Sequence, residues 1–450
     1  MTTQFPAPTI PPAVKPLGVV ASLKAVRNNV LNIIPAIAYT QPIVTGTTGP
    51  ARWHMVQGPE GMKRVFLDNV GNYPKSEVMI RMLRPAVGRS LFTSEGAEWR
   101  WQRRAIAPVF AARNVDALAP MMSETAERVV AQIGPQGGTF PAVETMMKAT
   151  FDVICDVALS GRDHFNSDAY AAAITKYFLT VGRASLLDFM RVPPWFPRPA
   201  ELTGSGAVRT MHRMVAKAID ERRQTGAGAV DDLLDHMLAA TDPNSGRAMT
   251  PKELLYNMQF FIVAGHETTA LTIAWALLML ASDQDAQTRA IEEAQKARDT
   301  DQLGANAVDL PFINAVLQET LRLYPPVGML ARDALGPDNL CGRDVRKRDT
   351  VFLNIYAMHR HDMYWEAPHA FLPERFLPEE VKSRDKYLHL PFGAGPRICV
   401  GANFAMLQAS VILANLLANF RFTLAGEVPK PVMHMTIRPE PDIHLRASPA

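Results

Sequence analysis

Cysteine is scarce in this sequence. Its 450 residues include three cysteines, Cys155, Cys341 and Cys399, which are odd in number and far apart. This count argues against a disulfide framework and against a four-cysteine zinc site, and it fits a reducing compartment. We therefore expect a cytoplasmic protein.

An excess of charge of one sign is lacking as well. The 47 Lys and Arg residues nearly balance the 44 Asp and Glu residues, which leaves a net charge of +3. A chain without a basic excess gives no reason to expect a nucleic-acid partner. The proline-rich start has no charged region followed by an apolar one, so it does not resemble a signal peptide.

One apolar stretch, residues 260–280, is long enough to cross a membrane. It contains His266 and Glu267 near its middle, where charge is costly in a bilayer. It therefore predicts a buried helix, and we expect membrane contact that is peripheral at most.

Helical patterns dominate residues 59–303. The clearest helix begins after Thr250, where Pro251 and Glu253 complete a capping-box pattern, and it continues to about residue 281. Further helices are predicted over 311–324 and 402–420, short strands over 42–59 and from 348, and loops over 192–206 and 241–250. We expect a mainly α fold with a minor β part. The whole chain, 1–450, should form one domain, with residues 1–50 supplying a proline-rich segment and the first strand.

The stretch PFGAGPRICVG, residues 391–401, places Cys399 where a glycine-rich loop becomes a helix. Amide donors and the helix dipole at such a position stabilise a thiolate. Gly393, Gly395 and Gly401 permit unusual backbone angles, and Arg397 offers a cation to an anionic group. From these residues alone, Cys399 is a nucleophile, a single metal ligand or a buried structural cysteine.

This stretch resembles the haem-binding signature of the cytochrome P-450 family, F-x-x-G-x-R-x-C-x-G. The sequence matches every fixed position of that signature: Phe392, Gly395, Arg397, Cys399 and Gly401. The resemblance implies a cytochrome P-450 fold, with a long central helix over haem b and a small β-rich region. It also implies that Cys399 is the thiolate ligand of the haem iron, and we expect a soluble, bacterial-type member.

A second motif, ETLR, places Glu319 and Arg322 three residues apart on one helical face. Alone it is typical of a surface ion pair. In the family, a buried Glu-x-x-Arg joins an arginine from a later P-x-R-F, which Arg375 supplies here. The resemblance gives these three residues, and His359 farther on, structural roles. Cys155 and Cys341 have no partner motif and are interpreted as structural too.

A third motif, AGHETT, lies in the long helix. It is not the zinc motif H-E-x-x-H, because Ala270 occupies the fifth position. It resembles the family's distal-helix motif. That resemblance implies that Ala264 and Gly265 leave room above the haem, that Gly265 lets the helix loosen, and that Thr268 holds dioxygen while Glu267 relays protons. His266 is an uncommon residue here and could alter the relay.

Candidate contacts to the haem propionates come from two further places. Trp99 and Arg103, four apart in WRWQRR, match a W-x-x-x-R pattern of the family, although a basic helix face would look the same. Arg332, past PPVGML, matches another family contact. With Arg397 these make three cations for two carboxylates.

The resemblance implies a haem-thiolate monooxygenase that uses O2 and an apolar substrate. About 50 residues follow Cys399, too few for a fused reductase, so electrons should come from a separate ferredoxin or flavodoxin-type partner. Candidate docking cations are Arg100, Arg103, Arg104, Lys382, Arg384 and Lys386. A peroxygenase, an isomerase and a non-enzymatic haem sensor stay open as alternatives.

By family analogy the substrate pocket draws on residues 79–92, 185–196, 260–264, 327–330 and 433–436. These segments are rich in Met, Leu and Phe, which suits a hydrophobic ligand. The motifs look more like the fatty-acid-hydroxylating and eukaryotic-style branches, so a fatty acid is expected first and a terpenoid or steroid next. Trp195 and Phe196 could form part of an access lid or touch a membrane.

Overall fold

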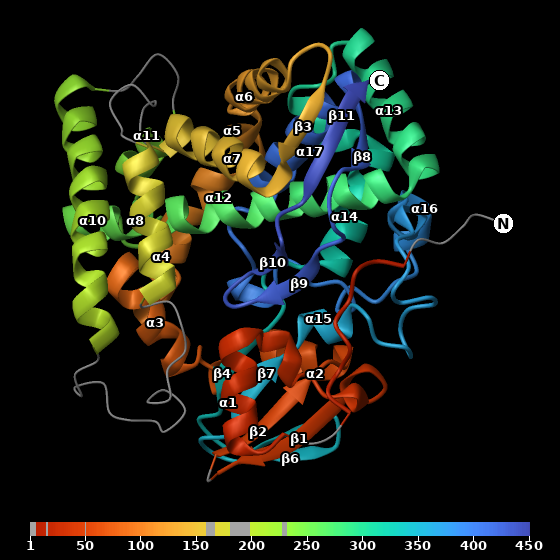
Figure 1. The fold of residues 1–450 in the computed structure, drawn as a ribbon. Helices are drawn as coiled ribbons and strands as arrows, with labels where there is room; N and C mark the ends of the chain where they lie inside the picture. Colours follow the sequence, from red (N-terminus) through yellow and green to blue (C-terminus); the bar gives the residue numbers. More distant parts are fainter. Residues whose placement is uncertain (1–5, 15–16, 50, 159–166, 181–198, 227–231) are drawn as a thin grey trace.

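A computed structural model of the chain describes residues 6–14, 17–49, 51–158, 167–180, 199–226 and 232–450. Most helices gather in one large body, and a small sheet with the N-terminal helix lies at its lower end in Figure 1. The expected loop at 192–206 is wrong in its second half, because residues 199–206 belong to a helix. The expected lid residues, 185–196 with Trp195 and Phe196, lie outside the described residues.

The helical body contains the helices that frame the site. They are α3 (Glu77–Val87), α4 (Gly96–Ile106), α5 (Ala112–Asp116), α6 (Ala119–Ile133), α7 (Ala142–Ala158), α8 (Ser167–Thr180), α10 (Pro199–Thr225), α11 (Leu233–Ala239), α12 (Pro251–Ser282), α13 (Gln284–Asp299), α14 (Pro311–Leu323) and α17 (Ala402–Asn419). Shorter helical segments are α1 (Val19–Asn28), α2 (Pro59–Lys63), α15 (Ile355–Met358), α16 (Pro378–Val381), η1 (Val30–Ile33), η2 (Ala36–Tyr39), η3 (Arg64–Asp68), η4 (Val70–Asn72), η5 (Ala107–Phe110), η6 (Ala305–Asp309), η7 (Pro373–Phe376) and η8 (Gly395–Arg397).

Helix α12 begins where the sequence predicts it. The Thr250 side chain accepts from the Glu253 N–H, and the Glu253 side chain accepts in return from the Thr250 N–H. At about 1.5 Å per residue its 32 residues span about 48 Å, and it crosses the whole helical body in Figure 1. Most of its residues are buried, which confirms that the apolar stretch is a core helix. Helix α17 is apolar on the same scale and is also mostly buried.

The β part is small. Strands β1 (Ile43–Thr48) and β2 (Ala51–Val56) form the predicted hairpin, and β7 (Thr350–Leu353) and β4 (Leu330–Asp333) complete a sheet in the order β1-β2-β7-β4. β3 (Gly138–Pro141), β11 (His444–Pro449) and β8 (Phe420–Leu424) form a second sheet. Two hairpins remain, β5 (Asp338–Leu340) with β6 (Arg343–Val345) and β9 (Lys430–Met433) with β10 (Ile437–Glu440). The mainly α prediction is confirmed.

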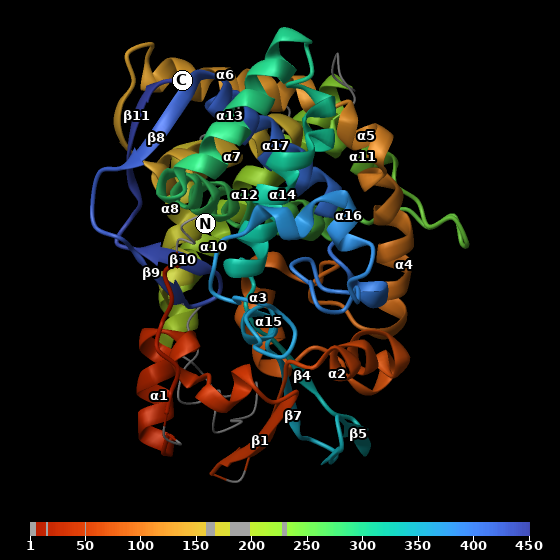
Figure 2. The same ribbon diagram turned by 90° about the vertical axis from the view of Figure 1, so that its right-hand side faces the viewer.

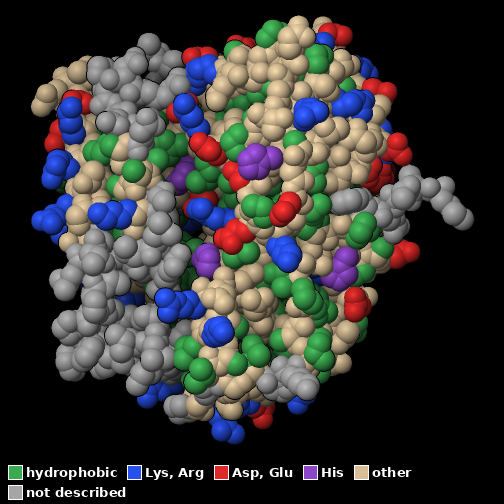
Figure 3. All heavy atoms as spheres, in the orientation of Figure 1, with side chains coloured by type: hydrophobic (Ala, Val, Ile, Leu, Met, Phe, Trp, Pro, Cys, Tyr) green, Lys and Arg blue, Asp and Glu red, His purple; other side chains and the backbone are tan. Residues whose placement is uncertain are grey.

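The surface carries acidic and basic side chains side by side on the face drawn in Figure 3. After a quarter turn, α4, α16 and α2 lie along one side of the molecule (Figure 2). Helix α4 on this side carries Trp99 and Arg103.

Candidate active site

Cys399 lies in a tight loop between η8 and α17. Its N–H donates to the Phe392 carbonyl at 2.9 Å, and the Ile398 N–H donates to the Gly395 carbonyl at 3.1 Å. Gly395 has a φ of 66°, and a Cβ there would overlap the backbone carbonyl of Phe66 in η3. Gly395 therefore adopts the unusual backbone angle that was expected, and it lets two backbone segments pack against each other, which fixes the loop that carries the cysteine.

The Cys399 side chain is exposed, yet it lies deep enough that burial raises the pKa of its thiol. Its open surface therefore faces an internal space. The Gly401 N–H donates to the sulfur, and Arg103 of α4 acts on it from nearby; both lower the pKa of the thiol, but less than burial raises it. A bound metal cation would reverse that balance and deprotonate the thiol.

Three cations, the buried Lys75 and Arg332 and the half-buried Arg397, gather around one carboxylate near this loop. Arg397 forms an ion pair with Glu95, whose Oε1 accepts the backbone N–H of Lys75 at 3.2 Å. Burial, and then Arg397, lowers the pKa of Arg332 to about 10 and that of Lys75 to about 7. Positive charge thus exceeds negative charge here, and the cluster is suited to bind further carboxylates.

Helix α4 links this cluster to the thiol. The Arg397 guanidinium lies 4.3 Å from the centre of the Trp99 ring, a cation–π contact. Arg103, one turn later, lies near enough to Cys399 for their charges to interact; burial lowers its pKa, and Cys399 opposes that change. The two residues of the predicted W-x-x-x-R pattern therefore lie on one face of α4, Trp99 against Arg397 and Arg103 in the field of the thiol.

Helix α12 borders the same internal space. Phe261 contacts Phe110, with ring centres 5.0 Å apart, and a Cβ on Gly401 would lie 3.8 Å from Phe110. On the other side, Phe260 lies 5.6 Å from Phe92, whose ring faces Lys75. Contacts between aromatic side chains therefore connect α12 with the cysteine loop on one side and with the cation cluster on the other.

The middle of α12 is half-buried at Ala264, Gly265 and Thr268, while residues 269–281 are buried. The Thr268 hydroxyl donates to the Ala264 carbonyl at 2.9 Å. A Cβ on Gly265 would lie 3.1 Å from Ile154 of α7, so this glycine allows α7 to pack closely. The helix is continuous through Gly265, and the expected loosening is not observed.

Two neighbours on α12 point to different partners. Glu267 accepts a hydrogen bond from Nε of Arg438 at 2.8 Å and another from the Thr436 hydroxyl. The His266 ring packs on Phe151 of α7, 5.4 Å away, and burial lowers its pKa. His266 therefore packs against the core on the α7 side, while the charge of Glu267 partly offsets the effect of burial on its pKa. Its influence on the relay stays a prediction.

The family model described as Cytochrome P-450 matches residues 11–446. The chain belongs to the cytochrome P-450 family. "Cytochrome P-450 4V2" of Homo sapiens is 27% identical over 414 residues, which are 85% of this chain and 78% of that protein. "Probable cytochrome P-450 4s3" of Drosophila melanogaster is 29% identical over 420 residues, which are 88% and 83%. The crystal structure of the cytochrome P-450DA haem domain is similar to this chain with a TM-score of 0.81, over 99% of this chain and 98% of the haem domain. The two sequences are 24% identical, so this likeness shows the fold.

The residues present fit haem b. Cys399 offers one sulfur ligand with an open surface, and Lys75, Arg332 and Arg397 offer more positive charge than Glu95 can balance for the two propionates. Bound here, haem supplies the chemistry of a cytochrome P-450 monooxygenase: one atom of O2 enters a hydrophobic substrate and the other leaves as water. Electrons reach such a P-450 from a reductase partner.

Lys75 and Glu95 were missed in the sequence because neither belongs to a motif. Their roles come from contacts with residues more than 200 positions away, Arg332 and Arg397. Arg438 was missed for the same reason, whereas Thr436 lies in a segment that was assigned to the pocket.

The structural triad is present as predicted. Glu319 receives Nε and Nη2 of Arg322 at 2.7 Å each, and Nε of Arg375 lies 3.5 Å from it. His359 connects the triad to the cysteine loop, because its Nε2 accepts the Leu390 N–H at 2.9 Å and its Nδ1 donates to the Arg322 carbonyl at 3.2 Å.

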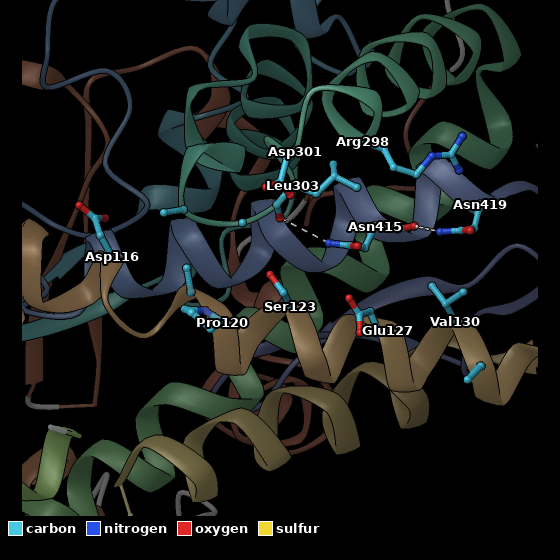
Figure 4. A pocket seen from close by; sticks show the side chains of 14 residues that line it. Asp116, Pro120, Ser123, Glu127, Val130, Arg298, Asp301, Leu303, Asn415 and Asn419 are labelled. Carbon is cyan, nitrogen blue, oxygen red and sulfur yellow. Dashed lines mark hydrogen bonds between the residues drawn. The ribbon is translucent and has the colours of Figure 1, made fainter. Parts of the chain in front are cut away.

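A groove of about 680 Å³ opens between α6, α17 and the segment before η6. In Figure 4, α6 points three side chains toward α17, those of Ser123, Glu127 and Val130. The side-chain amide of Asn415 donates a hydrogen bond to the Leu303 carbonyl. None of the predicted site residues lines this groove. It is a surface feature separate from the haem site.

Proposed function

We propose that this P-450 hydroxylates a long apolar substrate, a fatty acid first and a terpenoid or steroid next. The observation that carries the proposal is a set of large apolar side chains that pack on the main core and still keep exposed surface: Met79, Phe92, Phe260, Val263, Met329 and Met435. They come from four of the five segments expected to line the pocket. We infer that they line an apolar substrate chamber beside α12, because a hydrophobic binding site usually takes this form.

The relatives support the choice of branch. The human and fruit-fly proteins reported above agree with the eukaryotic-style appearance of the ETLRLYPP and FGAGPRIC motifs, which suggested fatty acids. The substrate class rests on that likeness and on the apolar lining.

Titration of the purified ferric protein with fatty acids, terpenoids and steroids tests the substrate class. An apolar ligand that binds beside the haem should move the Soret band toward the high-spin position. A saturable shift with fatty acids alone supports the proposal. A shift with terpenoids or steroids alone would make that class the proposed substrate, and no shift with any class would contradict the proposal of an apolar substrate.

Within this function we assign Thr268 and Glu267 to dioxygen and proton handling. The half-buried Thr268 hydroxyl borders the chamber, and Glu267 is its neighbour. Thr268→Ala should lower O2-driven turnover about a hundredfold or more, the range typical of lost proton transfer, and leave peroxide-driven turnover intact. Equal loss of both would contradict the assignment. Activity without reductant would favour an isomerase. Efficient turnover with peroxide alone would favour a peroxygenase, and the absence of coupled reductant consumption would favour a sensor.

The six predicted docking cations differ in the partners that they already have within the chain. Arg104 pairs with Asp242 at 2.7 Å and Lys382 with Glu379 at 2.8 Å, so both charges are already neutralised. Arg384 packs on the rings of Trp365 and Phe376, and Arg103 interacts with Cys399. Of the six predicted cations, Arg100 and Lys386 are exposed and form no ion pair among the described residues, although Lys386 Nζ lies 5.6 Å from the centre of the Tyr387 ring.

We therefore propose that a separate, acidic ferredoxin or flavodoxin-type partner docks near Arg100 of α4 and Lys386, which follows α16 in the sequence. Arg100→Glu with Lys386→Glu should slow reduction by the partner, with a smaller effect at high salt, and leave substrate affinity unchanged. Lys24→Glu on α1 is the matched control. Unchanged reduction in the double variant would exclude this surface.

We also propose a cytoplasmic location with at most peripheral membrane contact. The two long apolar helices are mostly buried in the fold, and Val14 and Val20 are exposed apolar residues near the N-terminal end. Cell fractionation tests this proposal: recovery in the soluble fraction supports it, recovery after an alkaline wash indicates peripheral contact, and retention after that wash contradicts it.

A further inference from the structure

A hydroxyl, an imidazole and a carboxylate lie in line in the small sheet of β1, β2, β7 and β4 (Figure 1). Thr45 of β1 and His54 of β2 are direct neighbours across the hairpin, and the Thr45 hydroxyl oxygen lies 2.9 Å from Nδ1 of His54. Nε2 of the same ring lies 2.9 Å from Oδ2 of Asp349, the residue before β7. This order of groups is the usual arrangement of a nucleophile, its general base and the residue that orients the base.

The surroundings of Asp349 decide which nitrogen of His54 carries the proton. The same carboxylate oxygen accepts the backbone N–H of Arg346 at 2.8 Å, and Nη1 of Arg52 lies 3.7 Å from it. An ionised carboxylate among such donors only accepts, so Nε2 of His54 donates to it. Nδ1 of the neutral ring is then an acceptor, and the Thr45 hydroxyl donates to it. Burial lowers the pKa of His54, although Asp349 opposes that change, so the ring is neutral at pH 7.

The three residues differ in their access to solvent. Thr45 is exposed, whereas the His54 side chain is 0% exposed and the Asp349 side chain 7%. The base and its carboxylate are therefore kept from water, and the hydroxyl is open to a molecule that approaches from solvent. The charge pair that forms when His54 takes up a proton is also stronger in such a buried place than it would be in water.

The backbone of Thr45 adds a hydrogen-bond donor beside its hydroxyl. In an antiparallel hairpin, hydrogen-bonded and non-hydrogen-bonded pairs alternate. The Gln57 N–H donates to the Pro42 carbonyl at 3.0 Å, so three positions farther along β1 the pair of Thr45 and His54 is a non-hydrogen-bonded one. The Thr45 N–H therefore points to the outer edge of β1, which ends the sheet, and it has no partner among the described residues. A backbone donor at this place can stabilise the oxyanion of an acyl transfer.

We propose that Thr45, His54 and Asp349 form a second catalytic site, which transfers the acyl group of a small activated ester to the Thr45 hydroxyl and then to water. The Thr45 oxygen forms a bond to the carbonyl carbon while its proton passes to Nδ1 of His54. The carbon–oxygen bond of the ester breaks, and His54 gives the proton to the oxygen that leaves. Water then attacks the acyl-threonine by the same route and restores the hydroxyl. The open position of Thr45 suits a compact ester.

Hydrolysis of p-nitrophenyl acetate by the ferric, haem-loaded protein without reductant tests the proposal. Thr45→Val should lower the rate above the buffer background about a hundredfold or more, the range of general-base catalysis, and His54→Gln should have a similar effect. Thr45→Ser should keep most of the rate. Thr47→Val is the matched control, because Thr47 is also exposed on β1 but lies opposite Arg52, and this variant should behave as wild type.

Mass spectrometry of protein quenched in acid during turnover gives a second measurement, which does not depend on the rate. One acetyl group should be found on Thr45 in the wild type, and little on this strand in His54→Gln. Thr45→Val keeps the shape of an exposed side chain, so it tests the site without a change of fold; haem content and far-UV circular dichroism check this for every variant.

Three results would overturn the proposal. Equal rates in wild type and Thr45→Val, or acetyl groups on lysine side chains alone, would exclude Thr45 as the nucleophile. An equal loss in Thr47→Val would show a general effect on the hairpin. A loss in His54→Gln without a loss in Thr45→Val would make the imidazole itself the reactive group. None of these measurements involves haem reduction or O2, so they are independent of the proposed hydroxylation.

Discussion

Replacing Glu319 with glutamine should remove the counter-charge of a guanidinium that has no contact with solvent. Glu319 and Arg322 are both 0% exposed, and Glu319 also accepts the Leu372 N–H at 2.9 Å. Glutamine keeps one acceptor oxygen, but its NH2 group then faces a donor of Arg322. Breaking a buried ion pair from one side costs about 3–5 kcal/mol, because the other charge is left unpaired.

The matched control is Lys382→Gln. Lys382 and Glu379 have the same three-residue spacing on a helix, but their side chains are 68% and 80% exposed. An exposed pair of this kind contributes under about 1 kcal/mol. The contrast between the two variants isolates burial as the cause.

The assay is urea unfolding of both variants and the wild type, followed by far-UV circular dichroism and by the haem absorption band. The slope with urea depends on the surface exposed on unfolding and should be shared, so the midpoints can be compared directly. We expect a large decrease in the midpoint for Glu319→Gln and almost none for Lys382→Gln. Haem should also be lost earlier from Glu319→Gln, because Arg322 and His359 connect the pair to the cysteine loop. Equal midpoints in the two variants would refute the reasoning.

Three further predictions concern charge and backbone. Without haem, burial lowers the pKa of Lys75 from its ordinary 10.5 to about 7, whereas the carboxylates of bound haem favour its charged form. Haem affinity should therefore fall as the pH rises above 7. Lys75→Met should abolish this pH dependence in haem-transfer measurements. Arg104 holds the pKa of Asp242 below its ordinary value, so the pair stabilises the fold fully above about pH 4 and this contribution is lost as the pH falls further. The melting-temperature gap between wild type and Asp242→Asn should therefore stay constant from pH 7 to about pH 4 and narrow below about pH 4. Gly395→Ala should prevent normal haem incorporation because of the overlap with Phe66, whereas Gly393→Ala, with 3.8 Å to the nearest atom, should cost only about 1–2 kcal/mol of backbone strain; similar haem occupancy in the two variants would contradict this.

Local patterns in the sequence determined much of this protein. The capping box of Thr250 and Glu253, the proline at the start of α14 and the apolar run of α17 act over a few residues, and each helix begins where these signals occur. The cysteine loop is likewise a short motif, so Cys399 and Arg397 could be predicted without any knowledge of the fold.

Tertiary structure decided the contacts between distant segments. Lys75 and Glu95 meet Arg332 and Arg397 only because β4, α4 and the cysteine loop converge, and nothing near Lys75 in the sequence signals this. Packing also decided which side of α12 each residue faces: His266 lies on Phe151 of α7, and Glu267 reaches Arg438 of β10. The physical reason is that capping and helix propensity depend on neighbours in the chain, whereas burial and charge pairing depend on neighbours in space.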